Sequence, residues 1–315
     1  FLDEIQEVQD WAKCVNSLRV NSEVDIYITG SNAKMLSGEY ATLLSGRYVE
    51  FSIYPFSFLE YCDAKKSEKD TKNINQLFNE YVKFGGLPFL ATSSLNEDAK
   101  MQYLKDIYDS VIIKDIVKRN NFRDINLLER IIAYTISNIG RTFSANSISS
   151  YLKSEHLKVS VDTIINYLNS CEKAYLFYKI KRVDLEEKEI LKINEKYYLA
   201  DHALRQALYG NNQQNIEIIL ENIVCLELLR HGYKVYIGKN KTKEIDFVAD
   251  KNGKRIYVQV CYMLSSLATE NREFSAYNGI ADNYPKYVLS MDEFDMSRNG
   301  IIHMNIRDFL LNFPQ

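Results

Sequence analysis

The sequence predicts a multidomain α/β protein, because three stretches of its 315 residues order their strands and helices differently. Residues 1–61 alternate apolar strand-like runs with amphipathic helical patterns, which is typical of a parallel sheet. Residues 125–200 give three helical segments and then two strands, the order of a winged helix-turn-helix. Residues 216–313 give a strongly apolar helix and then strands connected by short turns. We therefore expect three domains, which are residues 1–95, 96–210 and 211–315.

Composition excludes several classes of protein. The chain is 46% apolar and 26% charged, which is ordinary for a globular protein. No apolar run approaches the roughly 18 residues of a membrane-spanning helix, and no signal peptide is recognisable, so we expect a cytoplasmic protein without a membrane partner. The five cysteines are scattered without a C-x-x-C pair, and we expect reduced thiols. A formal net charge of −3 gives no general attraction to nucleic acid.

The first candidate site is the acid pair Asp3–Glu4, which follows two apolar residues and precedes a helical pattern. An Asp at the tip of a strand can hold the Mg²⁺ of a nucleotide, and a Glu beside it can polarise a water molecule. The simpler alternative is a pair of surface carboxylates at the start of a helix, where acidic side chains are favoured.

Two more segments combine an apolar, strand-like run with adjacent polar residues. Residues 25–29 form another strand-like run that leads to Ser31 and Asn32, whose side chains can also simply cap the helix expected next. Gly46-Arg47-Tyr48 then precedes a strand expected over residues 48–53. The segments therefore give the β-α-β-α-β order of a parallel sheet.

In order and spacing these segments resemble the second half of an AAA+-type P-loop ATPase. The match is to a large bacterial and archaeal family in which the ATPase domain precedes a C-terminal domain of unknown function. The resemblance implies that Asp3 and Glu4 are the Walker B acids, with Asp3 bound to Mg²⁺ through the nucleotide. It also implies that Ser31 and Asn32 occupy the sensor-1 position. The run Pro-x-Ser-Phe-x-Glu that begins at Pro55 closes the ATPase domain in this family.

Arg47 has two candidate roles. The resemblance makes it an arginine finger that reaches the nucleotide of a neighbouring subunit, which would require a homo-oligomer. Equally, Arg47 can be a structural residue that pairs with Glu50.

The phosphate-binding motif of such an ATPase, G-x-x-x-x-G-K-[ST], does not occur in the 315 residues. The resemblance places this motif before Asp3, and Phe1 is already in a strand-like run. We therefore expect a longer natural protein whose cofactors are ATP and Mg²⁺, and no nucleotide binding by this route in the 315-residue chain alone. The missing strand also predicts an unpaired sheet edge.

The run Gly85-Gly86-Leu-Pro88 fits the family pattern, and its simpler explanation is a helix end followed by a turn. In the winged-helix segment, a recognition helix would begin near Ser160 with few basic side chains. The candidate contacts to a DNA backbone are Lys179, Lys181 and Arg182 on the wing. Because DNA-binding wings are usually more basic, an interdomain scaffold is the alternative.

The C-terminal segment has the residue order of restriction-endonuclease-like, PD-(D/E)xK-type domains, with Glu221 on a helix, Asp246 in a strand, and Gln259 and Cys261 in the next strand. Asp and Gln oxygens can hold Mg²⁺, and this chemistry needs a Lys at position 261 to place the attacking hydroxide. Cys261 carries no fixed charge, and Gln259 holds a hard cation less strongly than Glu would. No lysine of the same strand is close enough to substitute. We therefore expect this fold without catalysis.

The function implied by the resemblance is ATP binding and hydrolysis, coupled to an unknown protein partner. One alternative is a DNA-binding or DNA-processing protein with a nuclease-like C-terminal domain. Another is a non-catalytic interaction module.

Overall fold

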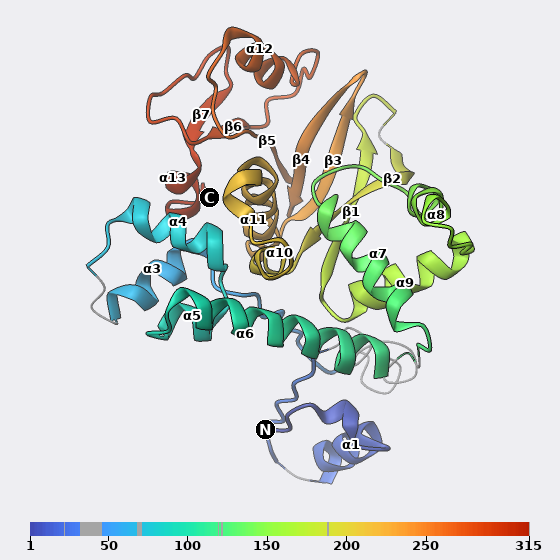
Figure 1. Cartoon of the computed structure of the whole chain (residues 1–315). Helices are drawn as coiled ribbons and strands as arrows, with labels where there is room; N and C mark the ends of the chain where they lie inside the picture. The colour runs from blue at the N-terminus through green and yellow to red at the C-terminus, as the bar shows by residue number, and fades with distance from the viewer. Residues whose placement is uncertain are drawn as a thin grey trace.

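The computed structural model describes residues 1–21, 23–31, 46–67, 71–118, 120, 122–187 and 189–314. A seven-stranded sheet occupies the C-terminal half, and helices of the middle segment lie beside it (Figure 1). The small unit formed by the first 31 residues lies at the opposite end of the molecule from helix α12, Leu267–Ser275 (Figure 1).

The N-terminal unit has its own small core. A parallel bridge joins Leu2 to Ile28, and the chain between them forms the 3-10 turn η1 (Ile5–Glu7) and helix α1 (Trp11–Asn21). The buried side chains recur at helical spacing along α1, but Val8 and Leu18, which fit the same spacing in the sequence, are 54% and 42% exposed, so the amphipathic pattern is confirmed only in part. A parallel sheet was expected here, and among the described residues of this unit the Leu2–Ile28 bridge is its one element. The core consists of Ile5, Trp11, Ala12 and Val15.

The strand expected over residues 48–53 is wrong. These residues are extended but unpaired, and Phe51 and Ile53 are 79% and 90% exposed. An extended segment becomes a strand only when a neighbour takes its backbone hydrogen bonds, and no segment within the described ranges pairs with it. The chain instead runs to Ser57, whose hydroxyl accepts from the Glu60 N–H at the start of α3.

Capping side chains set the starts of several helices in residues 58–173. Asn73 and Gln76 form a capping box at α4, and Asn96 accepts from the Ala99 N–H at α6. Helix α6 runs to Ser110 and continues directly as the π-helix η3. The helices are α3 (Phe58–Ser67), α4 (Ile74–Phe84), α5 (Pro88–Thr92), α6 (Glu97–Ser110), η3 (Val111–Lys118), α7 (Ile125–Ser137), α8 (Ala145–Ser154) and α9 (Val161–Lys173).

The three helices α7 to α9 and the hairpin that follows confirm the order predicted for the middle segment. The hairpin is part of the large sheet, because Arg182–Asp184 of β1 pair in parallel with Ile237–Lys239 of β3. The strand order is β2-β1-β3-β4-β5-β6-β7. Their bounds are β1 (Phe177–Asp184), β2 (Glu189–Leu199), β3 (Lys234–Asn240), β4 (Lys243–Lys251), β5 (Lys254–Val260), β6 (Lys286–Ser290) and β7 (Ile302–Asn305).

Helix α11 (Ile216–Arg230) lies against this sheet and is apolar almost all round, as a helix enclosed by other elements must be (Figure 1). Its buried residues join the main core with strands β3 to β6. A second core cluster, which includes Cys261, Phe274 and Tyr277, lies between the sheet and the segment that contains α12. The remaining elements are α10 (Ala203–Tyr209), η4 (Asn212–Asn215) and α13 (Ile306–Leu311).

Residues 209–215 have the Gly-, Asn- and Gln-rich composition of a linker, but they are held in the fold. Asn212 is fully buried and donates from Nδ2 to the carbonyls of Val82, at 3.2 Å, and His202, at 3.0 Å. A side chain that satisfies two buried carbonyls fixes the chain in place. The sheet and these contacts both cross residue 210, and the domain boundaries stay predictions.

Candidate functional site

The acid pair lies beside the polar end of the second N-terminal run. The Thr29 hydroxyl donates to Asp3 Oδ1, and the Glu4 N–H donates to Thr29 Oγ1 at 3.3 Å. Ser31 Oγ donates to Glu4 Oε2 at 3.1 Å. The parallel bridge between Leu2 and Ile28 brings the two runs together in this register. Sequence reasoning grouped Asp3, Glu4 and Ser31, and the structure brings these three side chains into one cluster.

Ser31 also reaches the middle segment. Its Oγ lies 3.5 Å from Asp115 Oδ1 on the π-helix η3, so the cluster contacts an element more than eighty residues later in the chain. A serine hydroxyl has one proton, and the shorter distance assigns it to Glu4. Asn32, the other expected sensor residue, lies outside the described residues.

Arg47 is exposed on a bend and makes no ion pair with Glu50 in the described part of the chain. The structural role expected for this pair is therefore not observed. The arginine-finger role stays a prediction.

The C-terminal candidates Asp246 and Gln259 lie next to each other on β4 and β5. The Asp246 N–H donates to Gln259 Oε1 at 3.2 Å, and Asp246 Oδ2 accepts from the Val260 N–H at 2.9 Å. Both residues are 9% exposed. Glu221 comes from α11, as expected, and faces the same cluster, because Lys196 contacts both Glu221 and Asp246.

Lys196 is a residue of this cluster that sequence reasoning missed. It comes from β2, and its Nζ lies 2.8 Å from Glu221 Oε1, 2.9 Å from Glu244 Oε1 and 3.8 Å from Asp246 Oδ1. The expectation from the sequence concerned lysines of the strand that contains Gln259, whereas Lys196 approaches the carboxylates from β2. The sequence does contain a signal for a buried lysine, because Lys196 directly precedes the apolar run Tyr-Tyr-Leu at the end of its strand.

The charged groups in this cluster strongly shift one another's pKa values. Burial lowers the pKa of Lys196, but the carboxylates of Glu221, Asp246 and Glu244 outweigh burial and leave that pKa raised. Burial, and then the Glu221 charge, raise the pKa of Asp246 well above its ordinary value. The Tyr198 hydroxyl donates to Glu221 Oε1 at 2.5 Å, and burial raises the Tyr198 pKa.

Cys261 lies in the second core cluster, where its thiol is 3.8 Å from the Leu289 carbonyl. Burial raises the pKa of Cys261 far above its usual range, so the reactive thiolate is disfavoured. Across the described ranges, no group of three or more His, Cys, Asp or Glu is arranged to hold a metal ion.

Two of the three wing cations already have partners. Lys179 pairs with Glu172 at 3.4 Å, and Arg182 pairs with Glu244 at 3.4 Å. Lys181 is exposed.

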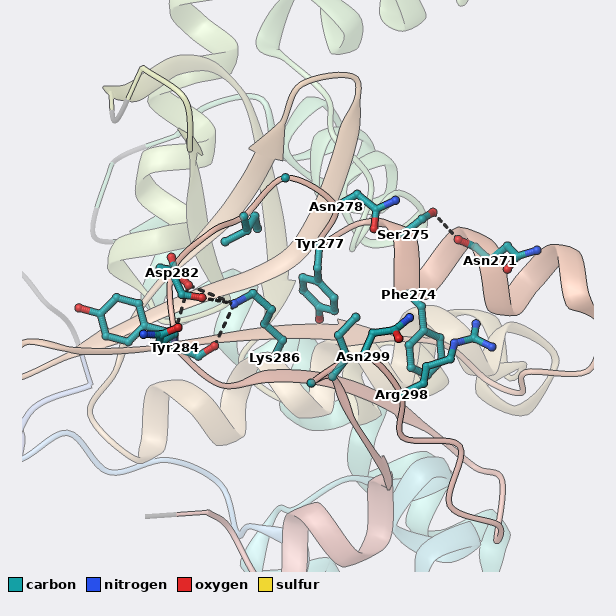
Figure 2. A pocket seen from close by; sticks show the side chains of 15 residues that line it. Asn271, Phe274, Ser275, Tyr277, Asn278, Asp282, Tyr284, Lys286, Arg298 and Asn299 are labelled. Atoms are coloured by element: carbon teal, nitrogen blue, oxygen red, sulfur yellow. Dashed lines mark hydrogen bonds and ion pairs between the residues drawn. The ribbon is translucent and has the colours of Figure 1, made fainter.

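A cleft of about 790 Å³ lies between α12, the loop before β6 and the turn before β7 (Figure 2). Its two main cations are already paired. Lys286 binds Asp282 at 3.1 Å, and Arg298 binds Glu270 at 2.8 Å and stacks 4.0 Å from the centroid of Phe274. The cleft is thus lined by neutral amides, aromatic rings and compensated charges.

Family models match two segments of the chain. The sequence model of a family described as "AAA domain" matches residues 1–62, and one described as "Domain of unknown function (DUF8612)" matches residues 75–215. The N-terminal segment is thus similar to an AAA domain. The match supports the coarser part of the resemblance, a P-loop ATPase-like N-terminal segment, and the details of the C-terminal domain stay predictions.

An uncharacterized protein of Haemophilus influenzae is 41% identical over 99% of this chain and 77% of its own length, and the chain belongs to the same family. Two uncharacterized proteins of Methanocaldococcus jannaschii are 33% and 23% identical, and the chain spans 64% and 59% of their lengths. A Walker-type ATPase of Pyrococcus abyssi has a TM-score of 0.44 and 13% identity, over 65% of this chain and 61% of the other.

No helix within the described ranges combines the length and the apolarity that crossing a membrane requires.

Proposed function

We propose that this chain is the greater part of an ATP-dependent AAA+-type protein that couples its nucleotide state to a protein partner. One observation carries the proposal. The Walker-B-like carboxylates Asp3 and Glu4 lie against the hydroxyls of Thr29 and Ser31, in the segment that matches an AAA domain. Acids and small polar side chains on adjacent parallel runs are what a nucleotide site of this type requires.

The side chains present fit Mg²⁺ and ATP. The donors are carboxylate and hydroxyl oxygens, which are the ligands that Mg²⁺ prefers. Bound Mg²⁺ would neutralise charge on the phosphates. In this proposal Asp3 is held in place by Thr29, and Glu4 polarises the attacking water while Ser31 orients its carboxylate. The contact from Ser31 to Asp115 on η3 supports a route by which the site can influence the middle segment.

The experiment uses the full-length gene product and its Glu4→Gln variant. The amide keeps the size and one acceptor of the carboxylate but cannot polarise water as well, so we expect ATP to bind with similar affinity. We expect ATP turnover to fall roughly 100-fold or more. Calorimetry gives binding and a phosphate-release assay gives turnover.

The matched control is Glu23→Gln, an exposed acid of the same unit. It should leave both binding and turnover unchanged. Equal turnover in Glu4→Gln and the parent protein would contradict the proposal. We also expect the 315-residue chain alone to show no saturable ATP binding at micromolar concentrations, since it contains no G-x-x-x-x-G-K-[ST] motif.

We further infer that residues 125–199 are a winged helix and that residues 216–315 have a restriction-endonuclease-like fold that does not cut DNA. The order helix, helix, helix, hairpin supports the first assignment. The position of Glu221, Asp246 and Gln259 on one helix and two adjacent strands supports the second. The hydrogen bonds that these residues already make to protein groups, and the buried ammonium group of Lys196 beside them, argue against catalysis.

A further inference from the structure

The ammonium group of Lys196 is enclosed by protein. Its side chain is 4% exposed, so water compensates little of the charge, and carboxylates must do so. Glu221 and Glu244 lie within 3 Å of Nζ, and Asp246 is just outside direct contact. Glu244 is the most exposed of the three acids, at 34%, and the cluster therefore reaches the surface on its side.

This cluster ties together elements that are distant in the chain. Lys196 belongs to β2, Glu221 to α11, and Glu244 and Asp246 to β4. Strands β1 and β3 lie between β2 and β4 in the sheet, so the long lysine side chain bridges over them. Removal of the ammonium group would leave the carboxylates of Glu221, Glu244 and Asp246 facing one another. It would also remove the ion pairs that join β2 to α11 and β4.

A divalent cation would have to share its place with the ammonium group of Lys196, and several of the oxygens around it already accept hydrogen bonds from protein groups. Asp246 Oδ2 accepts from the Val260 N–H, Gln259 Oε1 accepts from the Asp246 N–H, and Glu221 Oε1 accepts from both Tyr198 and Lys196. Mg²⁺ and Mn²⁺ require several oxygen ligands with free lone pairs. The residues present therefore do not fit a divalent metal while Lys196 is in place.

We propose that Lys196 is an internal counter-ion that fills the cation position among Glu221, Glu244 and Asp246, so that the nuclease-like centre fixes β2 to α11 and β4 without a divalent metal. The centre is thus a structural lock between the hairpin and the C-terminal sheet. A protein that loses the lysine should gain a site for a divalent cation at the same place.

The test is thermal unfolding of the full 315-residue chain and its Lys196→Met variant, first in EDTA and then with millimolar Mn²⁺ or Mg²⁺. Methionine keeps the length and apolar stem but removes the charge. In EDTA we expect the variant to lose roughly 5–10 °C in Tm, because unpaired buried carboxylates are costly. Divalent cation should recover at least half of that loss in the variant and shift the Tm of the parent chain by less than about 1 °C.

The matched control is Lys181→Met, an exposed lysine of the same hairpin, which should show neither the loss nor the metal response. A second variant, Lys196→Met with Glu221→Gln and Asp246→Asn, removes most of the repulsion. It should recover stability in EDTA and lose the response to Mn²⁺.

An unchanged Tm in Lys196→Met would overturn the proposal, and so would a Mn²⁺ shift in the parent chain as large as that in the variant. If Lys196→Met does not fold in EDTA, we expect it to refold when Mn²⁺ is added, and we expect the triple variant to fold in EDTA without metal. Failure of the triple variant to fold where Lys181→Met folds would equally overturn it.

Discussion

At the scale of single residues, the junction between α4 and α10 depends on two glycines that face Asp201. Gly85 has a φ of 72°, in the left-handed region, and an added Cβ would lie 1.9 Å from Asp201 Oδ1. The Gly86 N–H donates to Asp201 Oδ2 at 2.8 Å. Burial raises the pKa of Asp201, so this carboxyl depends on such hydrogen bonds. The simple explanation of the Gly-Gly run, a helix end, is confirmed, and close packing adds a second reason for it.

We predict that Gly85→Ala destabilises the chain by roughly 3 kcal/mol or more, because it combines backbone strain with a clash against a buried carboxyl. Gly210→Ala is the control, since Gly210 also has a positive φ, of 63°, but open space around it. That change should cost only about 1 kcal/mol of backbone strain. Urea unfolding of both variants gives the two free energies, and equal losses would show that the contact with Asp201 does not matter.

Residue identity predicted the members of each site better than it predicted their surroundings. Asp3, Glu4 and Ser31 were grouped correctly because the acids and the serine end adjacent runs. Lys196 could not be placed, because its three carboxylate neighbours are set by how β2 packs in the tertiary structure and not by spacing within one strand.

At the scale of elements, the hairpin β1–β2 belongs to two parts of the structure. It completes the helix-helix-helix-hairpin order of a winged helix, yet β1 is also an inner strand of the seven-stranded sheet. Its cations Lys179 and Arg182 are engaged by Glu172 and Glu244. The hairpin is therefore held on one side by the helices and on the other by the C-terminal sheet, which favours a scaffold over a free DNA-binding wing.

We predict weak DNA binding that falls steeply with added salt, because few free cations are available to contact phosphates. Changing Lys179, Lys181 and Arg182 together to Ala should abolish the remaining binding. Fluorescence anisotropy with labelled duplex DNA at two salt concentrations measures the effect, and circular dichroism confirms that the variant stays folded. Tight, sequence-selective binding that survives the triple change would contradict the wing assignment.

Helices that depend on apolar spacing and capping residues within one segment were predicted well. Elements that depend on contacts with a distant segment were not. Helix α1 follows from apolar spacing, and α6, α7, α8 and α9 follow from apolar spacing and side-chain caps. Residues 48–53 have the apolar content of a strand but lack a neighbour in the described structure, so they stay extended and exposed. Residues 209–215 look like a linker in composition, but Asn212 is buried and donates to the Val82 carbonyl of α4, which is far away in sequence.

At the scale of the whole molecule, buried polar contacts join segments that the sequence divides into domains. Asn212 and Asp201 connect the turn after α4 to α10 and η4, and Lys196 connects the hairpin to α11 and β4. The parallel pairing of β1 with β3 adds a continuous sheet across the same boundary. A change in the N-terminal unit that reached η3 through Ser31 and Asp115 would therefore meet one connected body of helices and sheet.

This arrangement leads to the prediction that the full chain cuts no DNA. Hydrolysis of a phosphodiester requires a positioned hydroxide and a cation that relieves charge on the phosphate, and both must reach the substrate. Asp246 and Gln259 are each only 9% exposed, their oxygens accept backbone N–H groups, and Lys196 is paired with carboxylates. We expect no cleavage of duplex, branched or single-stranded DNA with Mg²⁺ or Mn²⁺ above the level of an Asp246→Ala control. Cleavage by the parent chain that disappears in Asp246→Ala, measured on labelled substrates by gel electrophoresis, would show instead that the centre opens to a metal and to DNA.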